Sequence, residues 1–178
     1  GLVIRETATQ LVFADGVPGA AVMVVGEAPG ADEDAQGKPF VGRSGQLLDR
    51  MLGSIGLSRA PGAGQMPFYI TNIVKYRPPN NRDPEPEEKR AFWPYLMRQL
   101  EVIAPKVVIT LGRHSGACFI PDLRISRDHG RARRVRFHDH EFLVIPLYHP
   151  AAALYNGSMR QTLIDDFLAA TRLAQQQT

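Results

Sequence analysis

The sequence predicts an α/β fold, a three-layer α/β/α sandwich with a central, mainly four-stranded parallel sheet. Four short apolar runs rich in β-branched residues are typical of strands buried on both faces, at residues 21–25, 68–71, 107–111 and 142–147. Segments of helical periodicity separate these runs, and strands that alternate with helices form parallel sheets. The chain has 178 residues, of which 44% are apolar, so we expect one domain over residues 1–178.

Each helix is predicted from its apolar spacing and from its ends. Residues 45–55 place apolar side chains three and four residues apart, which predicts an amphipathic helix. Residues 85–103 begin with acids and Pro86 and end before Pro105, as helices commonly do. Two further helices are expected, a short one at 112–119 and a final amphipathic one at 159–174.

The composition argues against a membrane-spanning or disulfide-stabilised protein. No apolar segment approaches the roughly 20 residues that are needed to span a bilayer. The chain has one cysteine, Cys118, so it cannot form an internal disulfide, which agrees with a reducing cytoplasm. We therefore expect a cytoplasmic protein with no membrane partner.

Basic residues concentrate in one part of the chain, although the net charge of +3 is modest. Residues 131–142 are expected to form a hairpin arm that leads into the last strand. The basic stretch is either a solvated loop or a surface that contacts phosphates. Its arginines are Arg124, Arg127, Arg131, Arg133, Arg134 and Arg136.

The first predicted strand ends in a loop rich in glycine and proline, which then re-enters a helix. Open α/β sheets bind ligands at this place, the carboxyl end of a strand. The loop brings two acids, Glu27 and Glu33, and one aromatic residue, Phe40, to the same small region. This combination suits a flat molecule with polar edges better than a pyrophosphate group.

Four stretches in a fixed order carry a resemblance to a known family. They read VMVVGEAPGADEDAQGKPFVGRSGQLL at 22–48, YITNIVK with RPPNNR at 69–82, PYL with IAPKVVI at 94–109, and HPAAAL at 149–154. This ordered set resembles the uracil-DNA glycosylase superfamily. Within it the chain is most similar to family 4, the bacterial and archaeal enzymes that normally carry an iron–sulfur cluster.

The resemblance also bears on cofactors, and we expect neither a cofactor nor a metal. Family 4 enzymes ligate a four-iron cluster through four cysteine thiolates. Two of the ligand positions, beside the Arg-Pro-Pro and Pro-Tyr-Leu motifs, are occupied here by Tyr76 and Trp93. We expect these aromatic side chains to fill the cluster's volume by packing against each other or against nearby residues.

The resemblance implies that Asn72 reads uracil flipped out of DNA. A side-chain amide of fixed orientation can accept from uracil N3–H and donate to O4, whereas cytosine presents the opposite pair. Taken alone, an asparagine at the end of a strand is more simply a turn residue bonded to backbone. By the same resemblance Phe40 stacks on the flipped base, although the simpler interpretation is an ordinary core aromatic.

His149 corresponds to the glycosylase histidine that donates to uracil O2. Breaking the N-glycosidic bond leaves negative charge on the base, largely on O2, so a donor there stabilises the transition state more than the ground state. A lone histidine in an apolar stretch is otherwise more often a core residue. This scheme needs no metal, and the other histidines show no metal-ligand spacing with acids.

Two interpretations of the water-activating residue stay open. Family 1 enzymes use an aspartate where this chain has Ala28, and the family 4 pattern has the same alanine with Glu27 beside it. Glu27 could position or deprotonate water, or it could be a loop carboxylate that accepts backbone N–H bonds. Glu33 matches a family acid whose expected role is to crowd uracil C5 and exclude thymine, with water activation second. Gly26 and Ala28 are expected at the substrate itself.

DNA contacts are expected from two segments. The residues after His149 resemble the loop that enters the minor groove during base flipping, although a plain connection between strand and helix is the simpler interpretation. Arg43 and Ser44 could contact a phosphate at the start of the following helix. The candidates after His149 are Pro150 and Ala151, which let the backbone approach phosphates, and Leu154 and Tyr155, which could fill the vacated stack.

The sequence therefore predicts a monofunctional uracil-DNA glycosylase that acts in base excision repair, with uracil-containing DNA, single- or double-stranded, as its partner. We expect a monomer in the bacterial or archaeal cytoplasm, associated with the nucleoid. Two alternatives remain, a protein that binds uracil or damaged bases in DNA with little turnover, and a glycosylase for another deaminated base such as hypoxanthine.

Overall fold

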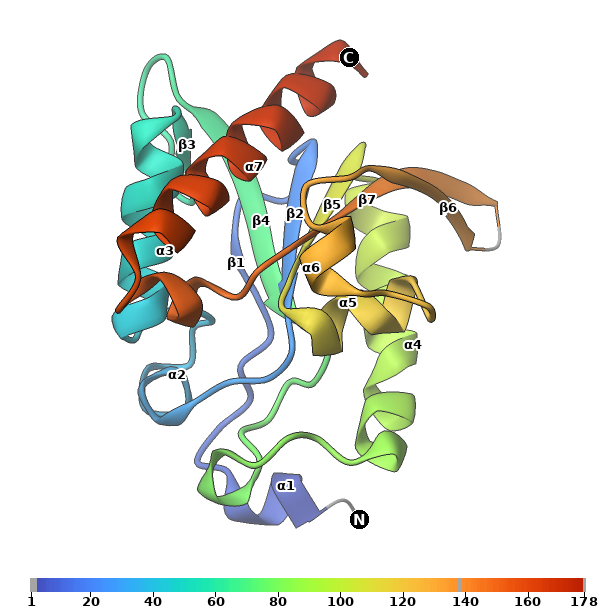
Figure 1. The fold of residues 1–178 in the computed structure, drawn as a ribbon. Coiled ribbons are helices and arrows are strands. Elements are labelled where there is room, and N and C mark those ends of the chain that lie inside the picture. Colours follow the sequence, from blue (N-terminus) through green and yellow to red (C-terminus); the bar gives the residue numbers. More distant parts are fainter. Residues whose placement is uncertain (1–2, 138, 178) are drawn as a thin grey trace.

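The computed structural model describes residues 3–137 and 139–177 and is built around one seven-stranded sheet (Figure 1). Four parallel strands form its centre, in the order β4 (Met66–Asn72), β2 (Val22–Gly26), β5 (Val107–Leu111) and β7 (His140–Leu147). Antiparallel strands lie at both edges, β1 (Asp15–Gly16) beside β4 and β6 (Arg133–Phe137) beside β7. The short β3 (Leu57–Ser58) runs parallel to the start of β4. The predicted, mainly four-stranded parallel sheet is therefore confirmed.

Helices cover both faces of the sheet, because alternate residues of each central strand point to opposite sides. Val22 and Val24 pack in one core with α3 (Arg43–Ser54) and α7 (Gly157–Gln176). The residues between them, Met23 and Val25, pack in a second core with α4 (Pro86–Ile103) and α5 (Arg113–Phe119). Two apolar cores on either side of one sheet make the predicted three layers. The remaining short elements are α1 (Val3–Thr7), α2 (Ala31–Gln36), α6 (Ile125–Asp128) and the 3₁₀ turns η1 (Pro79–Asn81) and η2 (Pro150–Ala153).

The basic stretch folds as α6 and the antiparallel pair β6–β7, as the expected hairpin arm requires. Three of its arginines are paired with nearby acids: Arg127 with Asp128, Arg133 with Asp122 and Arg134 with Glu141. None of the six arginines lines either of the two cavities described below. The positions of these arginines therefore favour a solvated surface over phosphate contact at either cavity.

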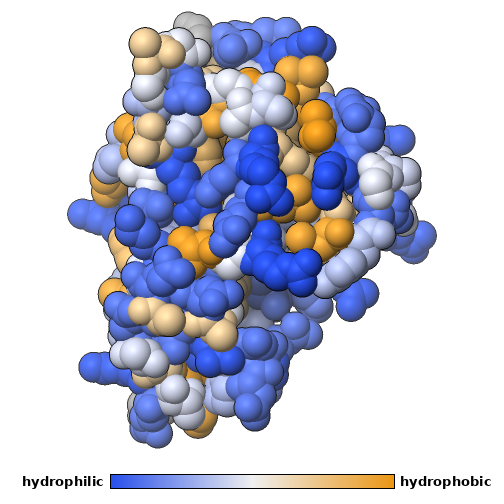
Figure 2. Space-filling view, turned by 90° about the vertical axis from the view of Figure 1, so that its left-hand side faces the viewer, coloured by the Kyte–Doolittle hydropathy of each residue, from blue (hydrophilic) through white to orange (hydrophobic). Residues whose placement is uncertain are grey.

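The outer surface is mostly hydrophilic. On the face shown in Figure 2, apolar groups occur in small areas that hydrophilic side chains interrupt. Within the described part of the chain, no helix has the length and apolar character required to cross a membrane.

Candidate functional site

The carboxyl ends of β2 and β4 bring the first two site residues together. Gly26 and Asn72 are the last residues of these strands and are partners in the parallel register. A Cβ atom added to Gly26 would lie 2.4 Å from Cζ of Phe40 and 2.5 Å from Oδ1 of Asn72. Only glycine therefore permits the aromatic ring and the amide to meet at this point.

Phe40, Asn72 and His149 line one cavity of about 530 Å³, here called the Asn72 pocket. Pockets of this size accommodate small molecules. The structure thus brings together the three residues on which the sequence-based proposal depends, although they come from three different segments of the chain. The other lining residues are Ala28, Gly30, Glu33, Ser44, Gly45, Asn81 and Ala151.

Asn72 presents an unused hydrogen-bond acceptor. The residue is 1% exposed, and its Oδ1 atom has no hydrogen-bond partner among the residues that the structure describes. Leaving a buried acceptor unpaired costs about 1–3 kcal/mol. Because Asn72 lines a cavity, a ligand N–H is the natural group to satisfy this acceptor.

His149 is arranged as a neutral donor. Its Nδ1 atom accepts a hydrogen bond of 3.0 Å from the backbone N–H of Ala151, which assigns the ring proton to Nε2. Burial lowers the pKa of His149 below its ordinary value, and the Glu33 carboxylate only partly opposes this. Its ring centroid lies 6.1 Å from that of Phe40. The site therefore offers a neutral N–H donor beside an aromatic ring.

The backbone of Phe40 is held in an uncommon conformation. Its φ angle is +54°, in the left-handed region that costs a residue other than glycine about 1–3 kcal/mol. The Arg59 guanidinium donates to the carbonyl oxygens of Pro39 and Phe40, at 2.5 Å each. Arg59 also pairs with Asp49 and Asp15, so its side chain is fixed. This role could not be predicted from the sequence, because Arg59 lies in the bend after β3 and matches no motif.

Glu33 supports the same loop from its other side. One carboxylate oxygen accepts from the N–H groups of Val41 and Gly42 at 2.9 and 2.8 Å, and the other accepts from Gly30 N–H at 3.0 Å. Three backbone donors leave this carboxylate poorly placed to activate water. Its expected role in excluding thymine stays a prediction, which is compatible with its position on the wall of the Asn72 pocket.

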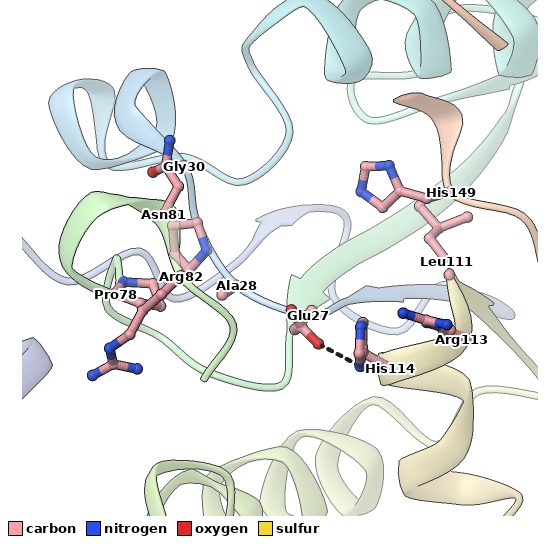
Figure 3. Close-up of a pocket in the computed structure, with 12 residues that line it drawn as sticks. Glu27, Ala28, Gly30, Pro78, Asn81, Arg82, Leu111, Arg113, His114 and His149 are labelled. Atoms are coloured by element: carbon pink, nitrogen blue, oxygen red, sulfur yellow. Dashed lines mark ion pairs between the residues drawn. The ribbon is translucent and has the colours of Figure 1, made fainter. Parts of the chain in front are cut away.

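A second cavity of about 370 Å³ adjoins the first and shares Ala28, Gly30, Asn81 and His149 with it. Figure 3 shows the Glu27 carboxylate in this cavity, directed toward His114. Glu27 Oε2 is buried and has no hydrogen-bond partner in the described part of the chain. Burial is the largest influence on this carboxyl group and raises its pKa. The alternative interpretation, in which the Glu27 carboxylate accepts hydrogen bonds from backbone N–H groups, is therefore not supported for its Oε2 atom.

Glu27, Asp83 and His114 also form a possible cation site, since one ligand atom of each lies within 4.8 Å of the others. The Lys89 ammonium lies 3.9 Å from the same Glu27 oxygen. The positive charge of Lys89 balances the negative charge of the Glu27 carboxylate and disfavours a bound cation at this place. We therefore interpret the group as a network of ionisable side chains.

An iron–sulfur cluster does not fit the residues present. A four-iron cluster needs four thiolates, and the chain has one cysteine. The two positions that the resemblance assigns to ligands hold aromatic residues: the ring centroid of Tyr76 lies 5.8 Å from that of Phe92, and the ring centroid of Trp93 lies 5.5 Å from that of Phe119 and 5.7 Å from that of Phe137. Neither side chain can supply a thiolate. The two aromatic residues pack against neighbours, which is one of the two arrangements expected from the sequence. Stoichiometric iron in the purified protein, with its visible absorbance, would contradict this assignment.

The packing of Trp93 leads to a stability prediction. Trp93→Ala is expected to lower the free energy of unfolding by about 2–4 kcal/mol, because it removes a partly buried ring from an aromatic cluster. Chemical denaturation measures the change. Tyr95→Ala, which removes a ring that is 57% exposed on the same helix, is expected to cost less than about 1 kcal/mol. Equal costs for the two variants would show that the cluster does not stabilise the fold.

The residues expected to contact DNA belong to the two segments that contribute Ser44 and Ala151 to the Asn72 pocket. Tyr155 is 81% exposed, and its hydroxyl lies 3.2 Å from Nη1 of Arg43. Leu154 packs against the core, so Tyr155 is the better candidate for the vacated stack. Of the remaining predicted residues, Ser44 and Ala151 line the pocket, while Pro150 is buried in η2 beside it.

Lys75 lies buried directly behind Asn72. Its ammonium donates to Oγ1 of Thr71, the carbonyl oxygen of Asn72 and Oε1 of Gln99, at 2.7, 2.6 and 2.6 Å. These acceptors satisfy all three N–H bonds of the ammonium. Burial nevertheless lowers the pKa of Lys75 to about 7. Lys75 thus fixes the backbone that carries the amide, a role that sequence reasoning missed.

The shifted pKa predicts a stability that depends on pH. Between about pH 7 and pH 10 the unfolded chain binds the Lys75 proton while the folded chain loses it. Stability should therefore rise with pH in this window, relative to Lys75→Met, by at most about 1.4 kcal/mol per pH unit. Denaturation at several pH values measures this difference. Lys106→Met, which removes an exposed lysine, serves as the control; parallel curves for parent and Lys75→Met would contradict the prediction.

Comparison with known proteins adds an independent finding. The family model described as "Uracil DNA glycosylase superfamily" matches residues 13–172. The "Type-4 uracil-DNA glycosylase" of Sulfurisphaera tokodaii is 45% identical over 172 residues, covering 93% of this chain and 76% of that protein. Proteins of the same name are 46% identical in Archaeoglobus fulgidus, covering 92% of this chain and 82% of the relative, and 37% identical in Thermotoga maritima, covering 89% and 80%.

Proposed function

The chain belongs to the uracil-DNA glycosylase superfamily, and we propose on this basis that it is a monofunctional uracil-DNA glycosylase. It hydrolyses the N-glycosidic bond of uracil flipped out of DNA and leaves an abasic site for base excision repair. The observation that carries the proposal is the unpaired, buried Oδ1 atom of Asn72, a residue that lines the same pocket as Phe40 and His149.

Asn72 supplies specificity. Its Oδ1 atom accepts the uracil N3–H, and its NH₂ group donates to O4. Cytosine has no N–H at N3 and carries an amino group in place of O4, so it would leave both hydrogen bonds unmade. Each mispaired group costs about 1–3 kcal/mol. Stacking on Phe40 adds an attraction that every base shares, so the amide provides the selection.

His149 stabilises the departing base. When the C1′–N1 bond breaks, its electron pair stays on the base and the negative charge spreads to O2. The Nε2–H donor meets that charge and is already oriented by the hydrogen bond from Ala151 to Nδ1. The hydrogen bond from the neutral imidazole to O2 becomes stronger as negative charge develops on O2, and the imidazole need not lose a proton first.

Glu27 activates the attacking water. Its carboxylate lies in the cavity that adjoins the Asn72 pocket and shares His149 with it. There the carboxylate accepts a proton from the water that attacks C1′, and its negative charge offsets the positive charge that develops on the sugar. Ala28, between the two cavities, leaves room for the substrate.

DNA is the partner, and the positions of Ser44 and Ala151 on the wall of the Asn72 pocket support the finer assignments. Tyr155 fills the space that the flipped base leaves, supported by Leu154 behind it. Arg43 and Ser44 contact phosphate, and Pro150 and Ala151 let the backbone approach it. The protein acts as a single-domain monomer on single- or double-stranded DNA in the nucleoid region of the cell.

The test is release of free base from matched oligonucleotides that contain uracil, cytosine or hypoxanthine at one position, in single- and double-stranded form. Release of uracil alone, with repeated turnover, supports the proposal. Tight binding of the uracil strand without release would show instead a binding protein. Faster release of hypoxanthine would show a glycosylase for another deaminated base.

A further inference from the structure

His114, at the start of α5, lies between the carboxylate of Glu27, which lines the second cavity, and that of Asp83. Its Nδ1 atom is 3.5 Å from Glu27 Oε2, and its Nε2 atom is 3.8 Å from Asp83 Oδ2. Figure 3 shows the contact with Glu27, with Arg113 beside His114 and with Asn81 and Arg82 across the cavity. A protonated imidazole can donate from both nitrogens, so it can serve both carboxylates at once.

Several charges act on Glu27 from the surrounding elements. His114 lowers the pKa of Glu27 more than Lys89 of α4 does, whereas Asp83, before α4, raises it. The largest influence on the pKa of Glu27 is burial, which favours the protonated acid. His114 and Lys89 oppose this influence, and Asp83 adds to it. The other titratable or charged groups that face this region are His149, Cys118 and the cavity-lining Arg82 and Arg113.

We propose that His114 is a positioning residue that acts through Glu27: it keeps the Glu27 carboxylate ionised in the cavity that Glu27 and His149 both line. The geometry supports this because Glu27 Oε2 has no hydrogen-bond donor within the described residues, so its environment is set by charges at 3.5–3.9 Å. His114 is the nearer of the two basic side chains, and its shorter side chain leaves it less freedom than the lysine. The inference rests on the proposed function and on the role given there to Glu27.

The experiment compares how uracil release depends on pH, from about pH 5 to about pH 9, in the parent and in His114→Ala. Removing the positive neighbour raises the pKa of Glu27, so the acid side of the profile moves to higher pH. On that side we expect rates roughly 3- to 10-fold lower, equivalent to a shift of about half to one pH unit. The rate on the plateau should change less than about twofold, because the geometry for leaving-group departure is untouched.

Three further variants make the result specific. Asp83→Asn removes the carboxylate that opposes ionisation, so it should move the acid side in the opposite direction, to lower pH. Glu27→Gln should abolish the acid side altogether. His140→Ala removes a histidine at the start of β7, in the hairpin arm, and should leave the profile unchanged. General disturbance of the fold cannot produce opposite shifts from His114→Ala and Asp83→Asn.

The failures can be told apart. A parent that releases no base contradicts the proposed function, and the role of His114 with it. A parent that turns over while His114→Ala keeps the parental profile, or loses the same factor at every pH, contradicts the role of His114 alone. Full activity in Glu27→Gln would show that the reaction does not need the Glu27 carboxylate. The role proposed for His114 would then be overturned as well.

Discussion

Asn72→Ala is expected to lower kcat/KM for uracil release roughly 10²- to 10³-fold. The variant loses two hydrogen bonds in a buried pocket, at about 1–3 kcal/mol each, and about 1.4 kcal/mol corresponds to a tenfold change in rate. Discrimination against cytosine should weaken as well, since the remaining contacts with Phe40 and His149 do not distinguish the two edges. Base release from uracil- and cytosine-containing oligonucleotides measures both effects.

The same variant should fold as well as the parent. Asn72 Oδ1 has no hydrogen-bond partner within the described chain, so its removal relieves an unpaired buried acceptor. We therefore expect the free energy of unfolding of Asn72→Ala to be equal to or higher than that of the parent. A loss of activity accompanied by a matching loss of stability would contradict the assignment of Asn72 to substrate recognition.

His149→Ala is expected to lower kcat roughly 10²- to 10³-fold, with a smaller change in KM. The lost donor acts mainly on charge that appears as the bond breaks, so the effect belongs to the chemical step. Single-turnover rates with saturating enzyme measure this step directly. A change confined to KM would show that His149 binds the ground state and the transition state equally well.

The protonation state of His149 gives a second check. Burial lowers its pKa, so the imidazole is neutral at pH 7 and stays neutral as the pH rises. Loss of a proton from His149 should therefore cause no fall in activity between about pH 7 and pH 8. A fall across this range that His149→Gln removes would show instead that an imidazolium is the active form.

The strands were more predictable than their exact ends. The run at 107–111 coincides with β5, because all five residues are buried on both faces. β7 begins two residues before the predicted run, at His140, because its first residues lie in the hairpin arm where polar side chains hide the apolar signal. α3 begins at Arg43, where the backbone of Gly42 caps the helix and no apolar periodicity marks the start.

The site was predictable where motif and topology agreed. Gly26 and Asn72 end adjacent parallel strands, so the sheet alone brings them together, and the resemblance added Phe40 and His149. The supporting residues were not predictable. Arg59, Lys75 and His114 each contact at least one residue that is distant in sequence, and a basic residue in a sequence does not indicate such a partner. The three backbone bonds to Glu33 likewise depend on how the loop folds back on itself.

A crystal structure with an oligonucleotide carrying 2′-fluoro-2′-deoxyuridine, whose glycosidic bond resists cleavage, tests the central claim most directly. We expect the uracil stacked on Phe40, with N3–H bonded to Asn72 Oδ1 and O2 within hydrogen-bond distance of His149 Nε2. Uracil bound elsewhere, or bound in the pocket with Asn72 Oδ1 still unpaired, would contradict the account.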